Sequence, residues 1–351
     1  MKKLFLLMTM ALANIPVINA QNDIDALLAA GVENAERFAN DYLEPGTNGL
    51  MHSMNANWFN TADAKPLGGF EISIIANASL ANDESKSFLM NIADYNSNPD
   101  QDFVVSFEDN AASKSVSTAL GENDPDVNIV LTYDDPVFGT QQETITLPSG
   151  IGSETANMLP TAFIQGALGL SKGFELKARF VPKIDTEDVD LSLYGAGLQM
   201  EFTKWLPADK ILPVAVSGLV AYTHLDGSYN LTESSGIDGD NQRLENATNT
   251  WLFQLIASTK LPVINFYGGL GYIKGKSESD LLGTYIISDG PIPALDPNSV
   301  EITDPFSVSS EVTAVRGTLG AKLKLGFFRL NAEYHISEFN AFSVGLHFGS
   351  R

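Results

Sequence analysis

The chain contains no cysteine, so no disulfide can hold a small secreted fold together. It also lacks any apolar run of about 18 residues, which excludes a helical membrane span. Basic residues are scarce, because 21 Lys and Arg stand against 43 Asp and Glu. Nucleic-acid phosphates are bound through Lys and Arg, so this balance argues against a nucleic-acid partner. The protein must therefore be stabilised in some other way.

The first twenty residues have the pattern of a secretory signal peptide. Lys2 and Lys3 form a positive start, residues 4–13 are apolar, and Ala20 ends an acceptable small-residue cleavage site. We therefore expect residues 1–20 to be removed by cleavage between Ala20 and Gln21. Removing the two lysines from the 21 basic residues leaves 19 against 43 acidic residues, a net charge of −24.

The C-terminal part of the chain alternates apolar and polar residues with a period of two, which is the period of a β-strand. The same alternation occurs in earlier segments, and the total is ten predicted strands of roughly the length of a tilted membrane strand. They are residues 70–78, 162–170, 174–180, 192–203, 214–223, 251–258, 264–272, 313–325, 328–336 and 342–348.

The connections between these strands differ in length according to the side on which they fall. If the first strand leaves the periplasm, the odd-numbered connections are 80–160, 184–189, 229–247, 277–309 and 337–341. The even-numbered ones are 171–173, 204–213, 261–262 and 326–327, and three of the odd-numbered connections are far longer than any of these. Outer-membrane barrels have short periplasmic turns, long external loops and an even strand number. We therefore predict an all-β, antiparallel transmembrane barrel of about 10–14 strands in a Gram-negative outer membrane, with both termini in the periplasm.

The acidic segment 80–160 leaves the strand number open. It contains 14 Asp and Glu but only two lysines, Lys86 and Lys114. Such a run is usually a solvated surface. Its strand-like stretches, 103–107, 127–133 and 144–147, either add strands to the barrel or form a β-rich excursion outside it.

A segment with helical periodicity precedes the first strand. Its apolar positions are Ile24, Leu27, Leu28, Ala35, Phe38 and Tyr42. Pro45 and Gly46 are expected to end the helix. The loop-rich stretch that follows contains four apolar candidates for ligand contact: Leu50, Met54, Trp58 and Phe59. We predict that residues 21–67 form a helical plug and that residues 68–351 form the barrel.

If the apolar faces of the strands contact lipid, the opposite faces line the lumen. The charged residues predicted there are Glu71, Glu175, Lys177, Arg179, Glu201, Arg316, Lys322, Lys324, Arg329, Glu333 and His335. Charges of both signs in a narrow lumen are paired or hydrated. They either brace the barrel or line a polar path, and the basic residues near the C-terminus are expected to face acids such as Glu175 and Glu201.

Little in the sequence points to catalysis. His335 and His347 share the lumen side, but no serine stands in a recognisable nucleophile motif. We therefore expect no catalytic residue, no cofactor and no metal ion.

The order of signal peptide, amphipathic helix, Trp- and Phe-containing segment and barrel strands resembles the outer-membrane transporters of long-chain fatty acids and aromatic hydrocarbons. In that family the N-terminal segment folds inside the barrel as a hatch, which here implies residues 23–67. The usual Asn-Pro-Ala hatch motif is absent, and residues 60–62 are the nearest match. Through residues 202–207 and 212–214, the chain also resembles uncharacterised outer-membrane barrels of gliding and gut-type Gram-negative bacteria.

These features predict a passive channel or transporter for small molecules, hydrophobic ones included. An apolar ligand would leave through the wall at glycine-rich spots such as residues 268–271, where strand packing is weakest. The alternative is a structural or surface-interaction barrel whose acidic loops carry the function. A membrane-embedded enzyme is the third hypothesis. The expected partners are outer-membrane lipid, the barrel-assembly machinery and a small-molecule ligand.

Overall fold

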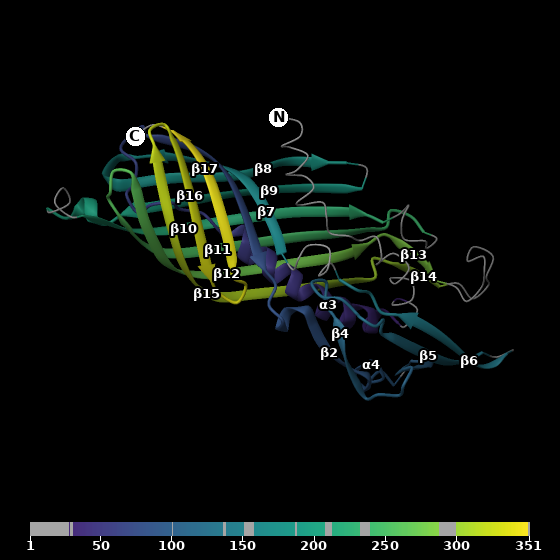
Figure 1. The fold of residues 1–351 in the computed structure, drawn as a ribbon. Helices are drawn as coiled ribbons and strands as arrows, with labels where there is room; N and C mark the ends of the chain where they lie inside the picture. Colours follow the sequence, from purple (N-terminus) through teal and green to yellow (C-terminus); the bar gives the residue numbers. More distant parts are fainter. Residues whose placement is uncertain are drawn as a thin grey trace.

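The computed structural model describes residues 28, 31–99, 101–135, 138–150, 158–186, 188–207, 213–231, 239–287 and 300–349. The predicted signal peptide lies outside them. Ten strands close into one antiparallel barrel in the order β1-β17-β16-β15-β12-β11-β10-β9-β8-β7 (Figure 1). These strands are β1 (Phe70–Leu80), β7 (Met158–Gly169), β8 (Phe174–Asp185), β9 (Val189–Glu201), β10 (Val214–Asn230), β11 (Arg243–Thr259), β12 (Ile264–Leu282), β15 (Phe306–Leu325), β16 (Phe328–Ile336) and β17 (Ala341–Gly349). The predicted fold class is confirmed, with the smallest strand number expected.

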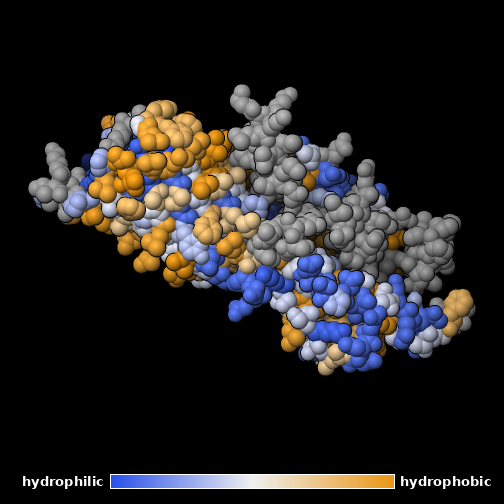
Figure 2. Space-filling model, in the orientation of Figure 1, coloured by the Kyte–Doolittle hydropathy of each residue, from blue (hydrophilic) through white to orange (hydrophobic). Residues whose placement is uncertain are grey.

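The outer face of the barrel carries an apolar band that ends at one level. On β12, outward-facing residues are apolar up to Tyr272 and charged from Lys274 to Asp280. The neighbouring strands change at the same height, where the rings of Tyr222 and Trp251 lie 5.1 Å apart. Figure 2 shows hydrophobic side chains gathered over this part of the barrel. The band matches the height of a transmembrane strand of about nine residues, and its aromatic edge suits the membrane interface.

The strands are longest on one side of the barrel. β10, β11, β12 and β15 have 17 to 20 residues, whereas β16 and β17 have 9 each. The extra length extends beyond the apolar band at the end of the long connections, where β13 (Thr284–Ile287) and β14 (Val300–Thr303) form a hairpin. The opposite end has the short connections, which include η2 (Ser171–Gly173) and η3 (Thr203–Trp205). We call the two ends the long-connection end and the short-connection end.

Between β1 and β7, the described residues form two small sheets outside the barrel. β2 pairs with β4, and β3, β5 and β6 form the second sheet. We call residues 84–147 the acidic module. Its core includes Met90, Phe107, Val116 and Ile129. Its elements are η1 (Glu84–Lys86), β2 (Ser87–Asn91), α4 (Ile92–Tyr95), β3 (Phe103–Phe107), β4 (Ser113–Ser117), β5 (Asn128–Asp135) and β6 (Gly139–Thr146).

One helix, α3 (Val32–Met54), joins the acidic module to the lumen of the barrel (Figure 1). It continues through Pro45 and Gly46, so the prediction that these residues end the helix is wrong. Proline removes one helical hydrogen bond, but tertiary contacts hold the helix on both sides of it. Phe38 is buried in the core of the acidic module, and residues 51–54 are buried in the barrel. No described helix is long and apolar enough to cross a membrane.

The chain enters the lumen from the long-connection end. Near this end the hydroxyl oxygens of Thr47 and Ser310 lie 2.6 Å apart. After crossing the lumen, the N–H of Gly68 donates to the carbonyl of Gly169 at the short-connection end, 3.0 Å away. Only then does β1 begin. The prediction that both termini lie at one end is therefore wrong for the N-terminal helix, because an even strand number constrains the strands and not a segment that threads the lumen.

Candidate functional site

Two arginines of the barrel wall hold the C-terminal end of α3. Arg179 Nη1 donates to the carbonyl of Met54 at 2.7 Å, and Arg316 Nη1 donates to that of His52 at 3.2 Å. Each arginine also donates to a second carbonyl just past the helix. The last carbonyls of a helix lack intrahelical partners and carry partial negative charge, so cations stabilise them. Arg316 thus binds backbone carbonyls rather than the predicted acids of other strands.

The rings of Trp58 and Phe59 fill the middle of the lumen and are almost fully buried. The Arg179 guanidinium lies 3.7 Å from the Trp58 ring centroid, which is a cation–π contact. Glycines make room for both rings: a Cβ at Gly197 would lie 3.1 Å from Trp58, and one at Gly269 would lie 3.2 Å from Phe59. The glycines therefore accommodate the segment inside the barrel.

The wall is closed where the sequence predicted an opening. β12 pairs with β11 and with β15 through every residue from Gly268 to Gly271. Small residues thus do not weaken the sheet here. They leave space on its inner face.

Near the short-connection end, one carboxylate forms ion pairs with several basic side chains. Glu71 is 3 % exposed and lies 2.8 Å from Arg329 Nη1, 3.4 Å from Lys322 Nζ and 3.5 Å from Lys65 Nζ. Asn60 donates to the same carboxylate at 2.8 Å. The acid that meets Lys322 of β15 and Arg329 of β16 is therefore Glu71 on β1, and not Glu175 or Glu201 as predicted.

Those two glutamates bind the backbone of the segment in the lumen instead. Glu175 accepts from the N–H of Lys65 at 2.9 Å, and Glu201 accepts from the N–H of Ala64 at 2.8 Å. Glu175 also pairs with Lys177 at 2.7 Å. Buried backbone donors outside regular structure need such partners. We call residues 49–66, which these contacts fix in place, the lumen segment.

Two further predicted residues, Glu333 and His335, belong to a buried network on the opposite wall. His335 Nε2 lies 3.0 Å from Glu333 Oε1, and the Tyr267 hydroxyl donates to Glu333 Oε2 at 3.1 Å. Thr318 Oγ1 lies 3.0 Å from His335 Nδ1. In the described chain, no group of three His, Asp or Glu residues is arranged to hold a metal ion.

The structure brings most of the predicted site residues together in one filled lumen. Met54, Trp58 and Phe59 are buried there, and Leu50 is partly buried. Lys324 lies apart at the mouth, where it donates to the carbonyl of Leu261 at 3.0 Å. Sequence reasoning missed Asn60 and Lys65. A signal for Lys65 was available, because it is the only lysine or arginine between Arg37 and Lys86.

A separate, apolar sector of the lumen lies beside an incomplete seam in the wall. β7 pairs with β1 over residues 158–168 but with β8 only over residues 164–169. Pro160 and Pro182 lie in the unpaired portions, and proline has no N–H for a ladder hydrogen bond. Behind the seam, Phe163 and Val181 belong to an apolar cluster that includes Met54.

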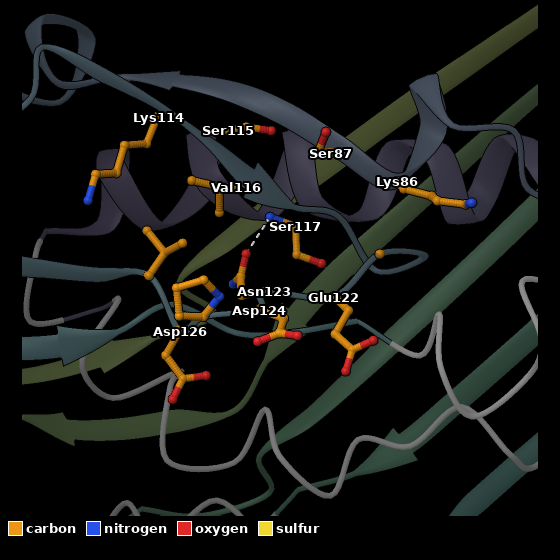
Figure 3. Close-up of a pocket in the computed structure, with 13 residues that line it drawn as sticks. Lys86, Ser87, Lys114, Ser115, Val116, Ser117, Glu122, Asn123, Asp124 and Asp126 are labelled. Carbon is orange, nitrogen blue, oxygen red and sulfur yellow. Dashed lines mark hydrogen bonds between the residues drawn. The ribbon is translucent and has the colours of Figure 1, made fainter.

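The acidic module has a polar cavity of about 640 Å³ beside β4 (Figure 3). Ser117 lines one side, and its N–H donates to Asn123 Oδ1 at 2.8 Å. Glu122, Asp124 and Asp126 line the other side. On α3, beside the module, burial and the nearby Glu44 raise the pKa of the Asp41 carboxyl.

A closed antiparallel barrel with an apolar outer band and a filled lumen defines the class as a plugged transmembrane β-barrel. The chain belongs to the family of unknown function DUF6588, whose model matches residues 1–350. No curated protein matches it. The family description names no substrate, so the resemblance to hydrocarbon transporters stays a prediction.

Among solved structures, the chain is similar to the beta domain of the Bordetella autotransporter Brka, with 10% identity, a TM-score of 0.35 and coverage of 81% of this chain and 100% of that one. It is also similar to the translocator domain of the autotransporter NalP from Neisseria meningitidis, with 12% identity, a TM-score of 0.27 and coverage of 95% and 99%. The ferric-catecholate import receptor Fiu from E. coli gives 9% identity, a TM-score of 0.28 and coverage of 78% and 55%. These likenesses are too weak to carry an argument about function.

Proposed function

We propose that the protein is an outer-membrane anchor, a plugged barrel that holds the acidic module at the cell surface. The observation that carries this proposal is the continuity of α3 with the lumen segment. At one end, Asn34 Nδ2 donates to the carbonyl of Tyr95 in the module at 3.0 Å. At the other end, Lys65 is bound by Glu71 and Glu175. Because long connections of outer-membrane barrels are external, this geometry supports an external module.

The contacts that the charged lumen residues make support an anchor rather than an open channel. Barrel residues that bind the lumen segment directly include Glu71, Glu175, Arg179, Glu201 and Arg316. A hydrated passage would leave such side chains to water, whereas here they bind backbone and side-chain groups of the plug. We therefore expect no steady conductance from the intact protein in a planar bilayer.

The absence of cysteine makes the orientation directly testable. Glu36→Cys places a thiol at an exposed position of α3, and Leu67→Cys places one at the short-connection end, where Leu67 is 76% exposed. Intact cells are treated with a maleimide coupled to a polymer too large to pass through porins. We expect labelling of Glu36→Cys in intact cells, and of Leu67→Cys only after the outer membrane is permeabilised. Labelling of Leu67→Cys in intact cells, with Glu36→Cys labelled only after permeabilisation, would contradict the proposal.

The seam between β7 and β8 favours a second candidate function. This function is the passage of a small apolar molecule between the lumen and the membrane. Replacing both Pro160 and Pro182 with valine restores two N–H donors and should close the seam. The measurement is uptake of the neutral dye phenylnaphthylamine by cells that make each variant. We expect slower uptake than with the wild type, whereas the matched control Pro213→Val should behave like the wild type. Unchanged uptake in the double variant would remove this candidate.

A further inference from the structure

A cavity of about 280 Å³ lies at the short-connection end, between the lumen segment and the wall. Its basic lining residues come from separate parts of the chain: Lys65, Lys204, Lys322, Lys324 and Arg329. Its acidic lining residues are Asp63 and Glu71. In a protein with a net charge of −22, this gathering of basic groups is unusual and indicates a site for negative charge.

The ion pairs behind the cavity leave positive charge in excess. Arg329, Lys322 and Lys65 all pair with Glu71, and Lys65 pairs in addition with Glu175. Glu175 is also the partner of Lys177. Four cations therefore share two carboxylates in a buried network. Buried charge without a full complement of partners is costly, so a bound anion would stabilise the network.

A buried amide adds a polar group to the same cavity. Asn265 lines it and is 1 % exposed. Its Oδ1 has no hydrogen-bond partner among the described residues. The oxygen and nitrogen of an amide exchange places by rotation, so Asn265 can present its NH₂ group as a donor to a ligand.

We propose that this cavity binds a small dianion of the phosphate type. Lysine ammonium groups and arginine forks are the side chains that bind phosphate oxygens. Basic residues outnumber acidic ones in the lining of the cavity, and a bound dianion would reduce this excess of positive charge. The volume admits free phosphate or a small phosphate ester. This site does not depend on the proposed anchoring function.

The test uses the purified full-length protein in detergent and inorganic phosphate as the probe. Titration calorimetry should show saturable binding of one phosphate per chain, measured against sodium chloride at the same ionic strength. Lys324→Gln should weaken binding about tenfold, because one charge-assisted hydrogen bond is lost. Lys204→Gln is a second variant at the same cavity. The matched control is Lys276→Gln, at an exposed site near the opposite end of β12, and it should bind phosphate as the wild type does.

A phospholipid headgroup also presents phosphate oxygens, although its phosphodiester carries one negative charge, and a second arm separates the two sources. The protein is reconstituted into phosphatidylcholine vesicles, with or without phosphatidylglycerol, in phosphate-free buffer. Its thermal unfolding is followed before and after inorganic phosphate is added. A higher unfolding temperature with phosphatidylglycerol assigns the site to a headgroup, and a rise only with dissolved phosphate assigns it to the free anion. If neither raises the unfolding temperature, or if Lys324→Gln and Lys204→Gln bind phosphate like the wild type, the proposal is overturned.

Discussion

The two halves of α3 pack against interiors of opposite character. In the acidic module, the Phe38 ring packs at 5.6 Å from the Phe88 ring, within an apolar cluster. In the barrel, the end of the same helix is bound by Arg179 and Arg316, and the chain beyond it is bound by Glu71. An apolar core sums many weak contacts, whereas a buried charge network depends on each partner. One helix can thus join two parts of a protein that respond differently to substitution.

The largest effect is expected from Glu71→Gln, which removes the carboxylate that three cations share. Leaving buried cations without a partner should destabilise the barrel by about 3–5 kcal/mol. Denaturant unfolding in detergent, followed by tryptophan fluorescence, measures this. The control Asp83→Asn breaks an exposed ion pair with Lys86 and should leave the unfolding midpoint unchanged. Equal midpoints for the two variants would contradict the role given to Glu71.

A smaller effect, confined to the other interior, is expected from Phe38→Ala. Truncating this buried ring should cost the acidic module about 3 kcal/mol, the lower end for a buried aromatic residue. The module should then be cleaved faster by protease on intact cells, while the barrel keeps its shift in mobility on an unboiled denaturing gel. Leu89→Ala, at a position that is 70% exposed, is the control. Loss of the barrel shift in Phe38→Ala would show that the two interiors are not separate.

The smallest effect is expected from Arg316→Lys, which keeps the charge but loses the planar fork. A single ammonium nitrogen cannot occupy the positions of both Nη1 and Nη2, which donate to different carbonyls at the end of α3, so a loss of about 1–2 kcal/mol is expected. The matched control is Arg243→Lys, whose ion pair with Glu245 is more than one-third exposed on both sides. Its unfolding midpoint should stay close to the wild type. Similar losses in both variants would mean that Arg316 contributes charge alone.

Much of the barrel was predictable because strand periodicity is a local property. The alternation around Phe266 and Leu319 places the apolar side chains on one face of the sheet, and in this barrel that face is the exposed one. Once the strands were assigned, the sequence also showed that the long connections lie on one side of the barrel and most short ones on the other. The helix end at Pro45 was mispredicted, since the local rule against proline was outweighed by burial of Phe38 on one side and Met54 on the other.

The amino-acid sequence by itself determined which face of each strand meets lipid and which faces inward, since successive side chains of a strand point to opposite sides. Only the tertiary structure decided from which end the N-terminal segment enters the lumen. It also decided that Glu71, and not Glu175 or Glu201, meets Arg329, which is 258 positions away along the chain. The physical reason is that barrel closure places β1 beside β17, one strand away from β16, and no local pattern encodes which buried charges then become neighbours.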